Sequence, residues 1–172
     1  CIPIDPFYLA WKAREYGFHT KFIELAGEIN NAMPYYVVNR VMKALNKQGK
    51  NLTSSRILVL GLTYKKDVDD IRESASFKLI ELLMEHGAHV DFNDPLVPKT
   101  KKYMIGDVVR TSVEISKASL KTYDCVLIAT DHSTYDYAFI TANTSLIVDT
   151  RNATSGLAGQ PATKKQAVIV KA

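Results

Sequence analysis

The sequence predicts an α/β protein in which a parallel sheet follows a helical segment. Apolar residues recur with a helical period through the first part of the chain, and a polar stretch follows. Short apolar runs then alternate with helical stretches. Continuously apolar runs of this kind are typical of strands that are buried on both faces of a parallel sheet.

The composition is that of an ordinary globular chain. The 172 residues are 47% hydrophobic and 23% charged, which suits one hydrophobic core with additional helices. No apolar run approaches the ~20 residues that span a bilayer. The net charge of +4 comes from scattered Lys and Arg. We therefore expect no membrane span and no nucleic-acid partner, and the mild basic excess suits a small anionic ligand.

The cysteines and the start of the chain indicate its setting. Cys1 and Cys125 lie far apart and form no CxxC pair, so neither a disulfide framework nor a zinc site is indicated. We expect no metal and a cytoplasmic location. Because the sequence opens at Cys1 with no initiator Met and no signal peptide, we also expect a longer parent chain.

Two helical stretches are expected before the sheet. Asp5 at an N-cap and Pro6 in the first turn form a helix-start signal, and this helix should end near Gly17. An apolar stripe then runs over residues 22–45. Pro34 interrupts the stripe, which leaves open one kinked helix or two consecutive helices.

A polar segment, residues 46–55, follows the stripe and marks our predicted domain boundary. It separates a helical segment at residues 1–50 from a sheet domain at residues 51–172. Helices are expected in the sheet domain at residues 76–86 and 112–119, with a loop at residues 156–166. Strands are expected at residues 56–61, 89–92, 108–109, 125–129 and 145–148, and residues 167–170 form either a last strand or a tail.

The loop after the first strand is a candidate ligand site. That strand ends at Gly61, and doubly wound sheets bind nucleotides at the carboxyl ends of their strands. A dinucleotide-binding turn needs several glycines and this loop has one, so ordinary dinucleotide binding is not expected here. Tyr64, Lys65 and Arg72 occupy the loop, and its basic groups suit phosphate. Taken alone, it is equally consistent with a solvated run of charges.

Other candidate residues are ambiguous by themselves. A lone cysteine such as Cys1 is more often a small buried residue than a nucleophile, and Asp5 alone indicates a helix cap. Cys125 lies in an apolar run and is expected to pack in the core. Asp94 is interpreted as a turn residue before a proline, and His132 follows a strand without an expected chemical role.

Three motifs occur together in this chain: Cys-Ile-Pro-Ile-Asp-Pro at residues 1–6, Gly-Leu-Thr-Tyr-Lys-Lys-Asp-Val-Asp-Asp-Ile-Arg-Glu-Ser at residues 61–74, and Asp-Thr-Arg-Asn at residues 149–152. The combination resembles the UDP-glucose/GDP-mannose dehydrogenase family, over almost the whole chain. Residues 1–16 and 129–137 are most similar to the UDP-N-acetylglucosamine 6-dehydrogenases of that family.

The resemblance implies a chemistry for the start of the chain. Such enzymes oxidise C6 of a sugar twice with NAD and do not release the aldehyde between the two steps. Cys1 matches the nucleophile, whose thiolate attacks the aldehyde; loss of a second hydride from the thiohemiacetal then gives a thioester. Asp5 matches the acid that orients or deprotonates the water that hydrolyses the thioester.

The resemblance also implies binding roles and partners. Tyr64 and Lys65 match residues that close on the nucleotide sugar, Arg151 matches a further arginine near the substrate, and Arg72 matches one that reaches the cofactor, NAD. The Asp-Thr-Arg around Arg151 departs from the Asp-Gly-Arg common in the family. The implied fold is Rossmann-like, preceded by a helical segment from a central dimerisation domain. The implied partners are a UDP-sugar, an upstream NAD-binding domain of the same chain and a second copy in a homodimer.

The expected function is therefore that of the C-terminal part of a dehydrogenase that converts UDP-N-acetylglucosamine to the uronic acid. Because the NAD-binding domain would lie upstream, these 172 residues alone should be inactive. Oxidation of UDP-glucose or UDP-N-acetylmannosamine is an alternative. Another is a non-catalytic UDP-sugar-binding or assembly module, in which Cys1 and Asp5 are structural.

Overall fold

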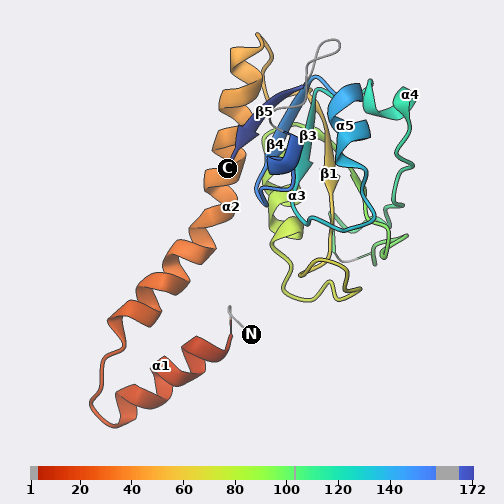
Figure 1. Ribbon diagram of the computed structural model, residues 1–172. Coiled ribbons are helices and arrows are strands. Elements are labelled where there is room, and N and C mark those ends of the chain that lie inside the picture. Colours follow the sequence, from red (N-terminus) through yellow and green to blue (C-terminus); the bar gives the residue numbers. More distant parts are fainter. Residues whose placement is uncertain (1–3, 103, 158–166) are drawn as a thin grey trace.

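The computed structural model describes residues 4–102, 104–157 and 167–172 (Figure 1). Two long helices precede an α/β unit with a parallel sheet, which confirms the predicted fold class. Cys1, the predicted nucleophile, lies outside the described residues. Within the described part of the chain, no helix is long and apolar enough to cross a membrane.

Helix α1, Asp5–Glu15, begins at the predicted start signal. Pro6 lies in its first turn, where the N–H that proline lacks would have no helical partner. Ile4 occupies the cap position, so Asp5 is the first helical residue, and the prediction that Asp5 is the N-cap is wrong by one position. The helix ends just before Gly17, whose φ of 74° reverses the chain direction at low steric cost.

Helix α2, Lys21–Lys47, is a single helix with Pro34 inside it, which resolves the alternative left open by the sequence. Because Pro34 has no N–H, the carbonyl of Asn30 one turn earlier loses its helical donor. The ring of Phe7 lies against the backbone of Gly27, where a side chain would force the ring to move. This contact packs α1 against the first half of α2.

The α/β unit contains five parallel strands in the order β2-β1-β3-β4-β5. The strands are β1 Arg56–Leu60, β2 His89–Asn93, β3 Cys125–Ile128, β4 Leu146–Asp149 and β5 Val168–Lys171. The helices of the unit are α3 Ala75–Glu85, α4 Lys117–Leu120 and α5 Tyr137–Asn143, with a short 3-10 turn at Ser155–Leu157. The order reverses between β1 and β3, which is where doubly wound sheets bind ligands.

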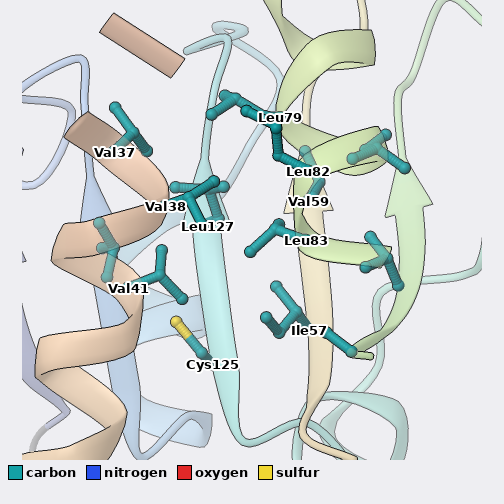
Figure 2. Packing of buried hydrophobic residues seen from close by; sticks show 14 of the residues in the cluster. Val37, Val38, Val41, Ile57, Val59, Leu79, Leu82, Leu83, Cys125 and Leu127 are labelled. Atoms are coloured by element: carbon teal, nitrogen blue, oxygen red, sulfur yellow. The ribbon is translucent and has the colours of Figure 1, made fainter. Parts of the chain in front are cut away.

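The core has two layers because the sheet is covered on both faces. On one face, α3 and the second half of α2 pack against alternate strand residues, as Figure 2 shows for Val38, Leu83 and Leu127. On the other face, α4 and α5 pack against the intervening residues. Cys125 is fully buried in the first layer, as predicted, and burial raises the pKa of its thiol to about 12.

Some element predictions were wrong. Residues 108–109 are exposed and form no strand; the nearby pairing is a single antiparallel bridge between Lys99 and Thr111. The helix expected at residues 112–119 is only the short α4, and α5 was not predicted. Of the two alternatives for residues 167–170, the strand is observed: β5 spans Val168–Lys171 on the edge of the sheet. The loop expected at residues 156–166 falls mostly outside the described residues.

Candidate functional site

The candidate site lies where the loops after β1 and β3 meet. Gly61, directly after β1, has a φ of 87°, and any side chain there would collide with Thr130, which follows β3. The hydroxyl of Thr130 donates to the carbonyl of Thr63 over 2.7 Å. The two loops are therefore in direct contact, and the backbone of Gly61 is covered by Thr130 and is not open to a ligand.

A cavity of about 220 Å³ lies beside this contact. It is lined by residues from α2, from the loops after β1, β3 and β4, and from the start of α3: Asn30, Thr63, Tyr64, Glu73, Ser74, Ala75, Ser76, Ala129, Thr130 and Arg151. Two of the residues proposed from the sequence, Tyr64 and Arg151, are thus brought together although they are far apart in the chain. The cavity also contains Asn30, which the sequence indicated only as part of a helix.

The amino-terminal end of α3 forms one wall of the cavity. Ser74 caps the helix by accepting a hydrogen bond from the amide of Ser76. The preceding Glu73 has a φ of 56°, a left-handed conformation that is uncommon for a residue with a side chain. Unpaired amides and the helix dipole give this end a partial positive charge, which favours an anion.

Arg151 brings a cation to the same cavity from the loop after β4. Its Nε donates to Asp131 Oδ1 over 3.0 Å, and half of its side chain is exposed. Because Nε makes this bond, the two terminal nitrogens of the guanidinium remain available to a ligand. The backbone amide of Arg151 is held by Asp149 Oδ1 at 3.0 Å, so the loop leaves β4 in a defined direction.

Asp149 stabilises that loop from inside the protein. Its buried carboxylate accepts hydrogen bonds from Thr154 and from Lys171 Nζ, the latter at 2.6 Å. Burial by itself would raise the pKa of Asp149, but the bonds from Lys171 and Thr154 outweigh it and lower the pKa to about 2. Asp149 is therefore charged at neutral pH and links β4 to β5.

Lys65 and Arg72 lie in the loop after β1, outside the cavity lining. Lys65 is exposed, with Nζ 5.5 Å from the ring centre of Tyr64, a distance that allows a cation–π contact. Arg72 is 85% exposed and forms a two-point pair with Asp70, at 3.0 and 2.7 Å. Hydrogen bonds from the Arg72 side chain and backbone lower the pKa of Asp70 to about 2. The structure thus does not bring Arg72 together with Tyr64 and Arg151.

Asp5 is exposed in the first turn of α1 and does not line the cavity. The start of α1 nevertheless lies near it, because Phe7 packs against Gly27, and Asn30, one turn later in α2, lines the cavity. No group of three or more His, Cys, Asp or Glu side chains is placed to hold a metal ion in the described ranges.

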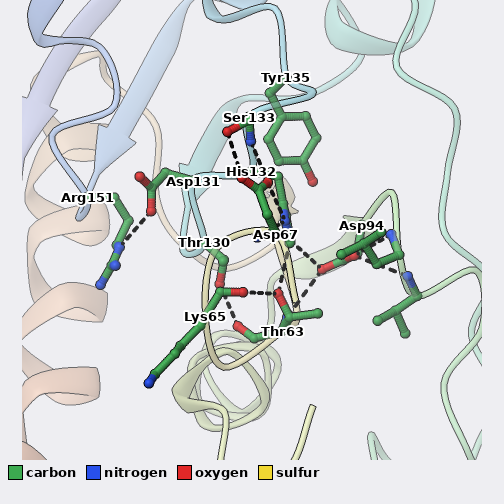
Figure 3. A network of polar contacts seen from close by, with 12 residues as sticks. Thr63, Lys65, Asp67, Asp94, Thr130, Asp131, His132, Ser133, Tyr135 and Arg151 are labelled. Carbon is green, nitrogen blue, oxygen red and sulfur yellow. Dashed lines mark hydrogen bonds and ion pairs between the residues drawn. The ribbon is translucent and has the colours of Figure 1, made fainter. Parts of the chain in front are cut away.

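A buried polar network next to the cavity has no counterpart in our sequence predictions (Figure 3). His132 is fully buried and contacts Thr63, Asp67 and Asp94, which belong to two other loops. Asp94 forms the expected turn by accepting from the amides of residues 96 and 97, and it also accepts from the amides of residues 62 and 63. The one sequence signal for this network was that His132 directly follows a buried strand. Its partners could not be found from the sequence, because they lie 38 to 69 residues away in the chain.

Comparison with known proteins connects this geometry to a family. Residues 58–156 match the UDP-glucose/GDP-mannose dehydrogenase family, UDP binding domain. That range includes the last three residues of β1, all of β3 and β4, and every residue of the cavity except Asn30. The match thus covers more than half of the chain and almost the whole candidate site.

Individual relatives agree with the match. Protein CapL of Staphylococcus aureus is 35% identical over 156 residues, covering 87% of this chain and 35% of that protein. A UDP-N-acetyl-D-glucosamine 6-dehydrogenase of Pseudomonas aeruginosa is 30% identical over 135 residues, covering 78% of this chain and 31% of that protein. The chain therefore spans about a third of the length of these relatives.

A solved structure extends the similarity to the fold. The UDP-D-ManNAc dehydrogenase of Pyrococcus horikoshii superposes with a TM-score of 0.76 at 26% identity, covering 99% of this chain and 37% of that one. The similarity thus includes both long helices as well as the sheet. On the match to residues 58–156, the chain belongs to the UDP-glucose/GDP-mannose dehydrogenase family.

Proposed function

We propose that the chain is the UDP-sugar-binding C-terminal part of an NAD-dependent nucleotide-sugar 6-dehydrogenase, with UDP-N-acetylglucosamine as the favoured substrate. The observation that carries this proposal is the cavity at the reversal of strand order. There Tyr64, Arg151 and the amino-terminal end of α3 meet within the segment that matches the family's UDP binding domain.

The chemistry of the cavity suits a diphosphate. The terminal nitrogens of Arg151 and the partial positive charge at the start of α3 both suit phosphate oxygens, and Lys65 adds a further cation beside the ring of Tyr64. At about 220 Å³ the cavity is smaller than the roughly 300–1,000 Å³ of a typical small-molecule site. It suits part of a UDP-sugar, and in our proposal the remainder of the site comes from the start of the chain and from an upstream domain.

At the end of β1, the described residues do not offer a dinucleotide site. Gly61 stands where a dinucleotide-binding turn would approach a pyrophosphate, but Thr130 covers it. The oxidation is therefore not proposed to take place at this sheet. We propose that an N-terminal domain of the same parent chain holds NAD. Arg72, at the surface and paired with Asp70, is proposed to reach that cofactor.

Cys1 and Asp5 are proposed as the catalytic residues. Support comes from the path of α2: Phe7 of α1 lies against Gly27, and Asn30 lies in the cavity wall. The start of α1 and the cavity are therefore neighbours along one stretch of helix. This neighbourhood supports the proposal that Asp5 acts beside a sugar whose diphosphate is held in the cavity.

A homodimer is proposed through the two long helices. The first half of α2 and the adjoining turn expose large apolar side chains, namely Phe18, Phe22, Leu25, Ile29 and Met33. A second exposed apolar surface on α1 consists of Ile4, Phe7, Tyr8 and Trp11. Exposed apolar surface on this scale is typical of an interface between protein copies. We expect Phe22→Asp to dissociate the dimer in a sedimentation experiment while the sheet unit stays folded. An unchanged mass would contradict the proposed interface.

The cytoplasmic location stays a prediction.

The test of the proposed function is binding of UDP to the 172-residue chain, measured by titration calorimetry. We expect UDP to bind, Arg151→Ala to weaken binding, and the matched control Arg72→Ala to leave UDP binding unchanged. Failure of UDP to bind, or equal effects of both substitutions, would contradict the proposed site.

Activity separates the alternatives. We expect the chain alone to form no NADH with UDP-N-acetylglucosamine, and the parent protein to do so more efficiently than with UDP-glucose or UDP-N-acetylmannosamine. A preference for one of the other two sugars would reassign the substrate. UDP binding by a parent protein that oxidises none of them would favour the non-catalytic module.

A further inference from the structure

His132 is the one fully buried histidine in the described residues, and it connects three loops at the carboxyl edge of the sheet. Its Nε2 lies 3.0 Å from Thr63 Oγ1 and 3.2 Å from Asp94 Oδ2. Its Nδ1 lies 3.0 Å from the amide nitrogen of Asp67. The ring therefore touches the loop after β1 at two points and the loop after β2 at one.

The hydrogen bonds determine the form of the imidazole. The Asp67 amide can only donate, so Nδ1 accepts and carries no proton. Nε2 then carries the proton and donates toward Asp94 Oδ2 and Thr63 Oγ1. The Thr63 hydroxyl is free to accept this bond because its own proton is donated to the carbonyl of Lys65 over 3.0 Å. Every donor thus has an acceptor when His132 is neutral with its proton on Nε2.

Thr63 and Asp67 are the two ends of the segment that carries Tyr64 and Lys65. At the first end, Thr63 is also held by Thr130. At the second end, Asp67 has a φ of 59°, and its carboxylate accepts from the Ser133 amide at 2.8 Å and from the Ser133 hydroxyl at 2.6 Å. These bonds lower the pKa of Asp67. Figure 3 shows Lys65 extending away from the network that holds both ends.

We propose that His132 is a positioning residue for the nucleotide site: its neutral imidazole holds both ends of residues 63–67 and so sets the placement of Tyr64 and Lys65. The Ser133 bonds hold the side chain of Asp67, whereas His132 holds its backbone amide. Without the bond to His132, the backbone at this end would be less ordered and would have to be ordered when the ligand binds, at a cost in conformational entropy. When the backbone is held at both ends, the segment is already ordered in the folded protein, and the ligand does not have to order it. This inference rests on the proposed function, because its consequence is for UDP binding.

Two substitutions separate the two nitrogens of the ring. In His132→Asn, the side-chain oxygen lies near the position of Nδ1 and can still accept from Asp67. In His132→Gln, the amide nitrogen lies near the position of Nε2 and can still donate to Asp94, but the acceptor for Asp67 is lost. The two variants are matched in polarity and differ in which loop end they hold.

The experiment combines nuclear magnetic resonance with UDP titration on the full chain. In the unsubstituted protein, ring ¹⁵N shifts should show a proton on Nε2 and none on Nδ1. His132→Gln should speed hydrogen exchange of the Asp67 amide and weaken UDP binding by about tenfold, the factor that corresponds to one ordinary hydrogen bond. His132→Asn should keep the Asp67 amide protected and most of the affinity, because Thr63 remains held by Thr130 and Asp94 when the Nε2 contact is lost. Exchange at Leu127 in β3 should be unchanged in both variants, which controls for folding.

Several outcomes would overturn the inference. A proton on Nδ1, unchanged exchange at Asp67 in His132→Gln, or equal UDP affinity in both variants would each do so. If the unsubstituted chain binds no UDP, the proposed function fails, while the ring shifts and the Asp67 exchange still report whether His132 holds the segment. If UDP binds equally to all three proteins, the proposed function stands and the positioning role fails.

Discussion

The apolar stripe of α2 is exposed before Pro34 and buried after it. Phe22 and Leu25 in the first half are 89% and 51% exposed, whereas Val41 and Leu45 in the second half are fully buried against the sheet. The periodicity is continuous across both halves, so the pattern alone does not distinguish them. What differs is the partner: the second half packs on a sheet of its own chain, and we propose that the first half packs on another copy.

The same division separates the proposed roles. The residues proposed for chemistry, Cys1 and Asp5, belong to the segment before and within α1, whereas Tyr64 and Arg151 belong to the sheet unit. Asn30, near the middle of α2, is where the two parts meet in the cavity wall. We call residues 1–33 the arm, and the second half of α2 together with the five-stranded sheet and its helices the sheet unit. The following predictions test whether these two parts differ in role and in stability.

The largest effect is expected for Cys1→Ser in the parent protein. A serine hydroxyl is a much weaker nucleophile at neutral pH than a thiolate, so formation of the uronic acid should fall on the order of a thousandfold or more. UDP binding should be unchanged because the residues proposed to bind the nucleotide, Tyr64, Lys65 and Arg151, lie on the sheet unit. Product formation at the unsubstituted rate would exclude the covalent route and leave the arm without a chemical role.

The second prediction compares Leu45→Ala with Leu25→Ala on the same helix. Leu45→Ala removes a fully buried side chain and should lower the free energy of unfolding by about 2–5 kcal/mol. Leu25→Ala should have little effect on the unfolding of the sheet unit and should weaken self-association. Urea denaturation and sedimentation measure the two quantities. Equal losses of stability in the two variants would show that both halves of the stripe contribute alike to the folding of the chain, and would contradict the comparison.

The third prediction concerns the loop on the sheet unit. Lys65→Ala should weaken UDP binding by about 1.5–3 kcal/mol, because a charge-assisted contact to a phosphate would be lost. Lys66→Ala is the matched control, since it removes another exposed lysine from the next position and should have a smaller effect. Titration calorimetry on both variants makes the measurement. Equal affinities for the two variants would remove the specific role of Lys65.

The fourth prediction is a pH dependence that belongs to the sheet unit. Burial raises the pKa of Asp149, but hydrogen bonds from Lys171 and Thr154 outweigh this effect and lower the pKa from 3.8 to about 2. A carboxylate with a lowered pKa in the folded state stabilises the fold above its unfolded pKa, and this contribution disappears as the pH falls through the folded pKa. The free energy of unfolding should therefore fall by about 2 kcal/mol between pH 4 and pH 2.

The control for this prediction is Asp149→Asn, which removes the titrating group and should flatten this part of the profile. The helical content of α1, which lies away from the β4–β5 edge, should not follow the same titration. A wild-type profile that the substitution leaves unaltered would show that other carboxylates govern the acid stability.

Most of the helices and strands could be predicted from the sequence. Helix α1, β1, α3, β2, β3 and β4 were all predicted near their observed positions, because each has a strong local pattern of apolar residues and turn signals. Residues 108–109 were misassigned because two adjacent valines favour a strand only when a neighbouring strand is available, and the structure leaves them exposed. Helix α5 was missed because only two of its residues are buried. The domain boundary at residues 46–55 stays a prediction.

The candidate site was less accessible to the sequence. Tyr64 and Arg151 were chosen by resemblance to a family, and the structure places them in one cavity; their roles stay proposals. Asn30 and His132 were not chosen, because their importance depends on neighbours that are distant in the chain. Arg72 was grouped with the site through its motif, yet its side chain pairs with Asp70 at the surface.

The sequence by itself determined the α/β class, the positions of α1, α3 and the first four strands, and the resemblance to the family, since these depend on local periodicity and on motifs that are read along the chain. Only the tertiary structure decided which half of α2 is covered, which loops meet at the carboxyl edge of the sheet and which protonation form of His132 satisfies its partners. Those features depend on contacts between residues tens of positions apart, such as His132 with Thr63, and no local pattern specifies them.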